Sequence, residues 1–320
     1  MKRRSDLALF VWCFLFGAFR RALIFLQAMM TTVTAAPGAT ILRAIGAMVL
    51  TALFFAISDV YAQVLTLSLP PLEVTFLRWL VFLVFLLCWL RGKTLSAFVT
   101  RSLGWQILRG LLMVFSGITF IIGIKNMSIS DATGVAFCGP VITMAMSVWF
   151  LGEHVGWRRW LVAAVSLIGV IIIVQPGTGA FQWASLLPLI AATFASGTVM
   201  LIRHMKGEHP DTTLAYSALV GFVVLSLVVP FVWVWPTSKD LFPIVMTGCF
   251  CGLANLTMIA AYRGGAASRI APFNYVQLPF AGLMGILVMN SFPTPLALLG
   301  MSLIGLSGVI NAWLEARTRA

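Results

Sequence analysis

Residues 53–90 read LFFAISDVYAQVLTLSLPPLEVTFLRWLVFLVFLLCWL, and this stretch decides the fold. It contains two apolar runs that meet at the proline pair Pro70 and Pro71. A helix needs about 20 mostly apolar residues to cross the hydrocarbon core of a bilayer. Proline stops a helix but is tolerated in the first turn of the next one. The stretch therefore predicts two transmembrane helices joined by a tight turn, with one charged side chain inside each, Asp59 and Arg78.

The same pattern of apolar runs extends over most of the chain. Hydrophobic residues make up 61% of the 320 positions, charged residues 9%, and the mean hydropathy is +1.02, whereas a soluble domain carries about 25% charged residues. Runs long enough to span a bilayer lie at 45–67, 72–90, 105–124, 131–150, 158–175, 183–203, 212–235, 241–262, 270–289 and 295–314. We therefore expect an all-α polytopic membrane protein of ten transmembrane helices.

The basic residues test this number of spans independently. When the segment before the first span is placed in the cytoplasm, 18 of the 21 Lys and Arg residues fall in cytoplasmic segments. Only Lys125 and Lys239 fall outside, and Arg78 lies within a span. Because cytoplasmic loops retain positive charge, this predicts a bacterial inner-membrane protein with both termini in the cytoplasm. The net charge of +12 is thereby explained by topology, and no nucleic-acid partner is expected.

Residues 1–40 form an amino-terminal extension that is not predicted to span the membrane. Its apolar run, Leu7 to Phe19, is only 13 residues long and is flanked by basic residues. Three interpretations fit it: an interfacial helix, a signal-like segment without a convincing cleavage site, or an untranslated stretch upstream of a start at Met29 or Met30.

An internal repeat appears when the chain is shifted by 139 residues. Ala52, Phe55, Ala56 and Val60 then fall on Ala191, Phe194, Ala195 and Val199, Pro71 on Pro210, and Pro140 on Pro279. The domains expected are a first five-helix repeat at 41–176, a second at 177–315 and a cytoplasmic tail at 316–320. Because five is odd, the second repeat enters the membrane from the opposite side. Such inverted repeats are typical of transporters that work by alternating access, with Pro140 and Pro279 as candidate hinges.

Asp59 and Arg78 are the charged residues predicted within spans. Counted from Pro70, their backbones differ in depth by about 4–5 Å, which an arginine side chain can reach across. Charges inside a membrane usually face a cavity or a partner. Two roles are open for this pair: a static ion pair that locks the helix hairpin, or an ionisable pair in which Asp59 couples transport to protons.

Polar and aromatic residues recur inside several predicted spans. The candidate substrate-binding residues are Phe55, Asp59, Gln63, Phe120, Thr193, Asn255, Tyr262, Asn274 and Gln277. Together they indicate a central cavity of amides, hydroxyls and rings with little fixed charge, which suits a neutral or zwitterionic, partly aromatic solute. The expected partners are this small molecule and membrane lipid.

No catalytic or metal-binding set accompanies these residues. The histidines (His154, His204 and His209) lie in predicted loops without acidic neighbours at ligand spacing. The five cysteines lack metal-ligand spacing and imply no disulfide framework. We therefore expect neither an enzyme nor a cofactor, and the oligomeric state is not predicted.

The chain resembles the EamA type of the drug/metabolite transporter superfamily over residues 41–315. The motifs that carry the resemblance are Arg78, Pro140 with the following Leu151-Gly152-Glu153, and the small-residue helix that ends at Leu167–Val170. The second repeat departs from the pattern, with Ser217 in place of Arg78 and Phe292 in place of Glu153. The resemblance implies ten helices in two repeats and secondary transport, by proton exchange or facilitated passage, of amino acids, nucleotide-like metabolites or vitamins.

Two turns are similar to those of a proteobacterial branch that includes riboflavin importers. They are Val155–Trp160 and Pro176-Gly177. A flat, neutral flavin suits a cavity lined by rings and amides, so riboflavin uptake is the first hypothesis. Export of amino acids or amphipathic drugs and metabolites is its rival, and a membrane channel or structural membrane protein is the alternative from another class.

Overall fold

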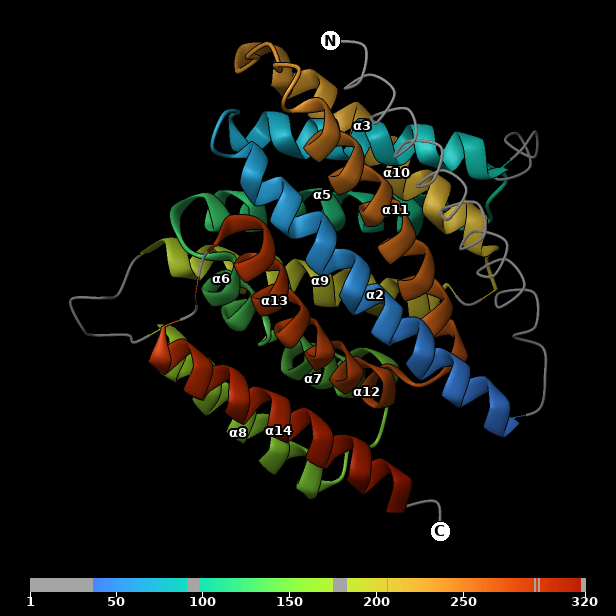
Figure 1. Ribbon diagram of the computed structural model, residues 1–320. Coiled ribbons are helices and arrows are strands. Elements are labelled where there is room, and N and C mark those ends of the chain that lie inside the picture. The colour runs from blue at the N-terminus through green and yellow to red at the C-terminus, as the bar shows by residue number, and fades with distance from the viewer. Residues whose placement is uncertain are drawn as a thin grey trace.

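The computed structural model describes residues 37–90, 98–174, 183–205, 207–290, 292 and 294–317 (Figure 1). The predictions for the apolar run and the start sites of the amino-terminal extension lie outside these residues. All the regular structure in the described part of the chain is helical.

The first half contains α2 (Pro37–Leu65), α3 (Pro71–Leu90), α5 (Leu103–Asn126), α6 (Ile129–Ala136), α7 (Gly139–Leu151) and α8 (Trp157–Val174). The second half contains η2 (Trp183–Ser185), α9 (Leu186–His204), α10 (Pro210–Val228), η3 (Val229–Phe231), α11 (Leu241–Gly264), α12 (Ala267–Ile270), η4 (Ala271–Val276), α13 (Gln277–Met289) and α14 (Pro295–Arg317).

Seven helical segments of the described chain are long and apolar enough to cross a membrane, and three shorter apolar helices lie at Trp160–Ile173, Phe273–Met289 and Pro295–Ser307. Their positions match the ten predicted runs, so the all-α polytopic fold is confirmed. The hairpin that decided the fold is present: α2 ends at Leu65, and α3 begins at Pro71.

The fourth and ninth predicted spans are broken rather than continuous. A turn at Phe137 and Cys138 separates α6 from α7, and the 3-10 segment η4 separates α12 from α13. Pro140 lies in the first turn of α7, where its missing N–H breaks no helical hydrogen bond, and Pro279 is the third residue of α13. The prolines therefore follow the breaks instead of kinking the middle of an intact helix.

The two repeats pack against each other in reciprocal pairs. α2 packs along α11, and α9 packs along α5; α3 contacts α11, and α10 contacts α5; α13 contacts α2, and α7 contacts α9. Exchanging the first repeat for the second converts each pair into the other, as a two-repeat fold requires. The core of the protein is therefore built between the repeats.

The last helices of the two repeats, α8 and α14, run side by side at one edge of the molecule (Figure 1). Gly169 packs directly against Gly300: a Cβ added to Gly169 would lie 2.7 Å from the carbonyl oxygen of Gly300, and a Cβ added to Gly300 would lie 2.6 Å from that of Gly169. The hydroxyls of Ser166 and Ser307 are hydrogen-bonded across the same contact. Small residues allow this backbone approach in lipid, where packing drives helix association.

Candidate functional site

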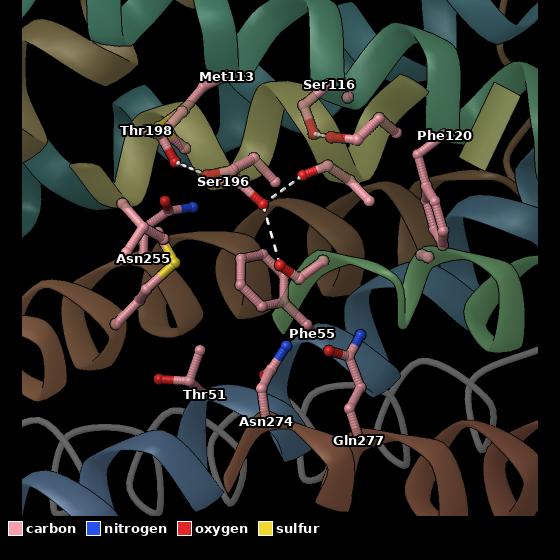
Figure 2. Close-up of a pocket in the computed structure, with 18 of the residues that line it drawn as sticks. Thr51, Phe55, Met113, Ser116, Phe120, Ser196, Thr198, Asn255, Asn274 and Gln277 are labelled. Atoms are coloured by element: carbon pink, nitrogen blue, oxygen red, sulfur yellow. Dashed lines mark hydrogen bonds between the residues drawn. The ribbon is translucent and has the colours of Figure 1, made fainter. Parts of the chain in front are cut away.

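A cavity of about 210 Å³ lies between the two repeats. Its lining comes from α2, α3, α5, the α6–α7 break, α9, α11, η4 and α13. In Figure 2, Ser116, Phe120 and Ser196 line one wall, and Phe55 and Gln277 lie across the cavity from them. Both broken helices therefore contribute to the cavity at their interruptions, as expected for a transporter site near the membrane centre.

The charged pair lies at one side of this cavity. Nη1 of Arg78 is 3.0 Å from Oδ1 of Asp59, and both side chains are buried. Nε2 of Gln277 donates to the other carboxylate oxygen at 3.5 Å. The carboxylate thus joins α2, α3 and the start of α13. Because the two charges neutralise each other, the lining has no net charge among its described residues.

Hydroxyl groups hold the broken helix of the first repeat against α9. The Thr143 hydroxyl donates to Oγ of Ser196 at 3.0 Å. Oγ of Ser196 is in turn 3.1 Å from the carbonyl oxygen of Gly139 and 2.8 Å from that of Ala192. This network fixes the first turn of α7, directly after the break, so the cavity wall depends on it.

Most of the predicted substrate-binding residues line the cavity: Phe55, Asp59, Phe120, Asn255, Tyr262, Asn274 and Gln277. Gln63 and Thr193 do not. Nε2 of Gln63 donates to the carbonyl oxygens of Ile124 and Met127 at 3.1 Å each, at the end of α5. Thr193 is exposed on α9 and donates only within its own helix, to Leu189. Of the two candidate hinges, Pro140 lines the cavity and Pro279 is not among its lining residues.

Arg109 corrects the distribution of charge expected from the sequence. The charge pattern counts Arg109 among the 18 cytoplasmic basic residues, but it lies inside α5 and is completely buried. Its guanidinium donates to Oγ of Ser217 and to the carbonyl oxygen of Thr213 on α10. The signal was available, since position 109 falls within the predicted span 105–124. The described spans therefore bury a second arginine besides Arg78.

Several lining residues were not predicted at all. They are Met113, Thr133, Thr143 and Cys251, among others. Cys251 could have been found from the sequence, because it precedes Asn255 by four residues and therefore lies on the same helix face. The others come from helices whose composition does not identify an inward face.

Polar contacts join helices and loops near both predicted faces of the membrane. Towards the predicted cytoplasmic face, Arg203 donates to the carbonyl oxygens of Tyr262 and Gly265 and lies 3.4 Å from Glu153. On the opposite face, Asp240 accepts hydrogen bonds from Ser68 and Thr237. Two effects act on the pKa of Asp240. Burial alone would raise it, but the hydrogen bonds from Thr237 and Ser68 have the larger combined effect, so the pKa lies below its usual value.

We expect Ser196→Ala to destabilise the protein while Thr193→Ala leaves it unchanged. The first substitution removes the acceptor of the Thr143 hydroxyl, and an unpaired buried group costs about 1–3 kcal/mol, so the Tm should fall by roughly 2–6 °C. The second removes a hydroxyl that bonds only within its own exposed turn. Thermal unfolding of the purified protein in detergent measures both. Equal losses would contradict the assigned network.

Comparison with known proteins places the chain in a family. Residues 42–175 and 182–313 each match the EamA-like transporter family. A riboflavin transporter of Vibrio cholerae is 30% identical over 277 residues, which are 83% of this chain and 92% of that protein. An S-adenosylmethionine uptake transporter of Rickettsia felis is 28% identical over 266 residues, 83% of this chain and 90% of that protein.

The fold is also similar to that of a solved crystal structure, with a TM-score of 0.71 at 16% identity over 89% of this chain and 100% of that chain. Two successive family matches agree with the reciprocal packing of the two repeats, and transporter relatives agree with a cavity enclosed by helices that are long and apolar enough to cross a membrane. The chain belongs to the EamA-like transporter family and is a multi-pass membrane transporter, not an enzyme.

Proposed function

We propose that the protein imports a neutral or zwitterionic metabolite with a flat heteroaromatic ring, and that riboflavin is the first substrate to test. The observation that carries this proposal is the neutral cavity: Asp59 and Arg78, the charged residues of its described lining, are paired with each other. The walls offer the rings of Phe55 and Phe120 for stacking and the amides of Asn274 and Gln277 for hydrogen bonds. A neutral flavin needs both kinds of contact and no counter-ion.

S-adenosylmethionine is the second candidate. The similarity to an uptake transporter of that compound supports it, at 28% identity. Its adenine ring would stack on the same aromatic side chains. Its net positive charge, however, has no unpaired carboxylate to balance it in the described lining, because Asp59 is paired with Arg78. The paired state of Asp59 therefore favours riboflavin.

The transport cycle that fits this architecture is alternating access. The cavity lies between repeats that pack reciprocally, so a small rotation of one repeat against the other would open it to one side and close it to the other. The breaks before Pro140 and Pro279 are the proposed hinges. Asp59 is the proposed coupling carboxylate: on protonation it would release Arg78, and the guanidinium would take a new partner.

The test is uptake of radiolabelled riboflavin by a riboflavin-auxotrophic bacterium that expresses the chain. We expect saturable uptake above the empty vector, competition by excess unlabelled riboflavin, and little competition by S-adenosylmethionine. Uptake of S-adenosylmethionine instead would favour the second candidate. Faster loss of either compound from preloaded cells, without uptake, would favour export of metabolites. If neither compound moves while the protein is present in the membrane, the proposed substrates are wrong.

A further inference from the structure

The serine and threonine hydroxyls of the cavity wall donate almost all their protons within the protein. A hydroxyl has one proton but can accept two hydrogen bonds. Of the seven Ser and Thr residues in the lining, all except Thr133 donate to another protein oxygen. The donors are Thr51, Thr75, Ser116, Thr143, Ser196 and Thr198. These side chains therefore present mainly lone pairs to a bound molecule.

Asn255 adds a buried acceptor whose orientation is fixed. Its side chain lies in the cavity wall and is fully buried (Figure 2). Nδ2 donates to the carbonyl oxygen of Cys251 at 2.9 Å, and a carbonyl oxygen can only accept, so the amide cannot be reversed. Oδ1 is consequently the group left over, and it is buried without a hydrogen-bond partner. Burying an acceptor in this way is costly unless a ligand supplies the missing donor.

Two further amides contribute acceptors to the same cavity. Nε2 of Gln277 is directed at Asp59, so its Oε1 is turned away from that carboxylate. Oδ1 of Asn274 is buried and has no partner. Figure 2 shows both residues on the side of Phe55, with Asn255 on α11 at another part of the wall. Amide oxygens of Asn255, Asn274 and Gln277 thus lie in the wall of one cavity.

We propose that this set of acceptors selects the substrate by its hydrogen-bond donors, with Asn255 as a specificity-determining residue. The favoured class carries ring N–H, amino or hydroxyl groups. Phosphorylated forms are rejected, because a bound anion needs an unbalanced positive charge and the charge of Arg78 is already balanced by Asp59. The first test below uses riboflavin and to that extent rests on the proposed function. A kinase reaction that phosphorylates the imported molecule would then produce a form that the transporter cannot return.

The first experiment measures riboflavin transport into vesicles that contain the purified protein. The competitors are riboflavin methylated at its ring imide nitrogen, which lacks one donor, and riboflavin 5′-phosphate. We expect each to inhibit at least about fivefold more weakly than riboflavin, the range for one unpaired buried group. Asn255→Leu should weaken riboflavin transport and bring the methylated compound close to riboflavin. Equal inhibition by all three compounds with the wild-type protein would overturn the inference.

Asn126→Leu is the matched control for Asn255→Leu. Nδ2 of Asn126 donates to the carbonyl oxygen four residues earlier, that of Ile122, as Nδ2 of Asn255 does to Cys251. Asn126 is exposed at the end of α5 and lies outside the cavity. It should leave the ranking of competitors unchanged. If both variants shift the ranking alike, the effect is structural, and Asn255 does not determine specificity.

A second experiment does not depend on riboflavin. Cys251 lines the cavity and becomes the sole cysteine when Cys13, Cys88, Cys138 and Cys249 are replaced by serine. Its reaction rates with an ammonium and a sulfonate methanethiosulfonate reagent are compared with those of a Ser238→Cys reference on the exposed loop. We expect the ammonium-to-sulfonate ratio at Cys251 to exceed the reference by at least about fivefold.

The two experiments separate failure of the inference from failure of the proposed function. A high ammonium preference at Cys251 without riboflavin transport would support the inference and refute the proposed substrate. Riboflavin transport that riboflavin and its phosphate inhibit equally would support the proposed substrate and refute the inference. A ratio at Cys251 equal to the reference, or lower, would overturn the inference whatever the substrate.

Discussion

Replacing Asp59 by asparagine is expected to reduce substrate uptake to the background of cells without the protein. The carboxylate is buried and forms the 3.0 Å ion pair with Arg78. Without it, the guanidinium of Arg78 is left as an unpaired charge inside the membrane. Breaking a buried pair by removing one partner costs about 3–5 kcal/mol. Uptake and the level of protein in the membrane are measured together, because the single substitution should lower both.

The double variant Asp59→Asn with Arg78→Gln separates the two roles of the pair. Both charges are then absent, and two neutral amides replace them, so membrane level and Tm should recover towards wild type. If Asp59 couples transport to protons, uptake by the double variant stays more than about tenfold below wild type, a change of 1.4 kcal/mol or more. Recovery of uptake together with stability would show that the pair is a static lock, and would remove Asp59 from the transport cycle.

The charge pair belongs to the first repeat only. Shifting Asp59 and Arg78 by 139 residues gives Thr198 and Ser217 in the second repeat. Thr198 still lines the cavity, whereas Ser217 accepts a hydrogen bond from the buried Arg109 of the first repeat. The two halves therefore share a backbone plan but not a charge distribution. This asymmetry indicates that only one half carries the proposed coupling carboxylate.

The membrane spans could be predicted because apolar length is a property of consecutive residues. The breaks in the fourth and ninth spans could not, since proline predicts a kink but not where the backbone unwinds. Pro140 instead sits just after the turn at Phe137 and Cys138. That turn is stabilised by residues distant in the sequence, such as Ser196, which contacts Gly139.

The cavity lining was predicted in part because a helix face can be read from spacing, whereas depth along that face depends on neighbours. Phe55, Asp59 and Gln63 share one face of α2, but Gln63 lies about 12 Å from Phe55 along the axis. There it meets the carbonyl groups of Ile124, in the last turn of α5, and of the C-cap residue Met127, which lack helical partners and accept hydrogen bonds from its amide. Only the three-dimensional position of α5 shows that Phe55 and Asp59 line the cavity whereas Gln63 caps the end of α5.

Gly248→Ala is expected to destabilise the protein strongly, although alanine is the better helix former. Gly248 lies on α11 where that helix crosses α3. An added Cβ would overlap the side chain of Val81 and lie 3.0 Å from the carbonyl oxygen of Arg78. Overpacking of this kind costs about 1–3 kcal/mol, which lowers the Tm by roughly 2–6 °C. Since the overlap pushes α3 away from α11, the Asp59–Arg78 pair should be displaced and uptake should fall as well.

Gly46→Ala provides the control, because it makes the same chemical change within α2 where no atom lies within 4 Å of the added Cβ. The gain in helix propensity is then unopposed and is worth up to about 1 kcal/mol. The Tm of Gly46→Ala should be equal to or above that of the wild type, and uptake should be unchanged. Opposite signs for the two variants would show that the α3–α11 contact, rather than helix propensity, makes glycine necessary at position 248. A similar small effect at both positions would mean that α3 can move away from α11 without cost, and that the position of Arg78 does not depend on their close packing.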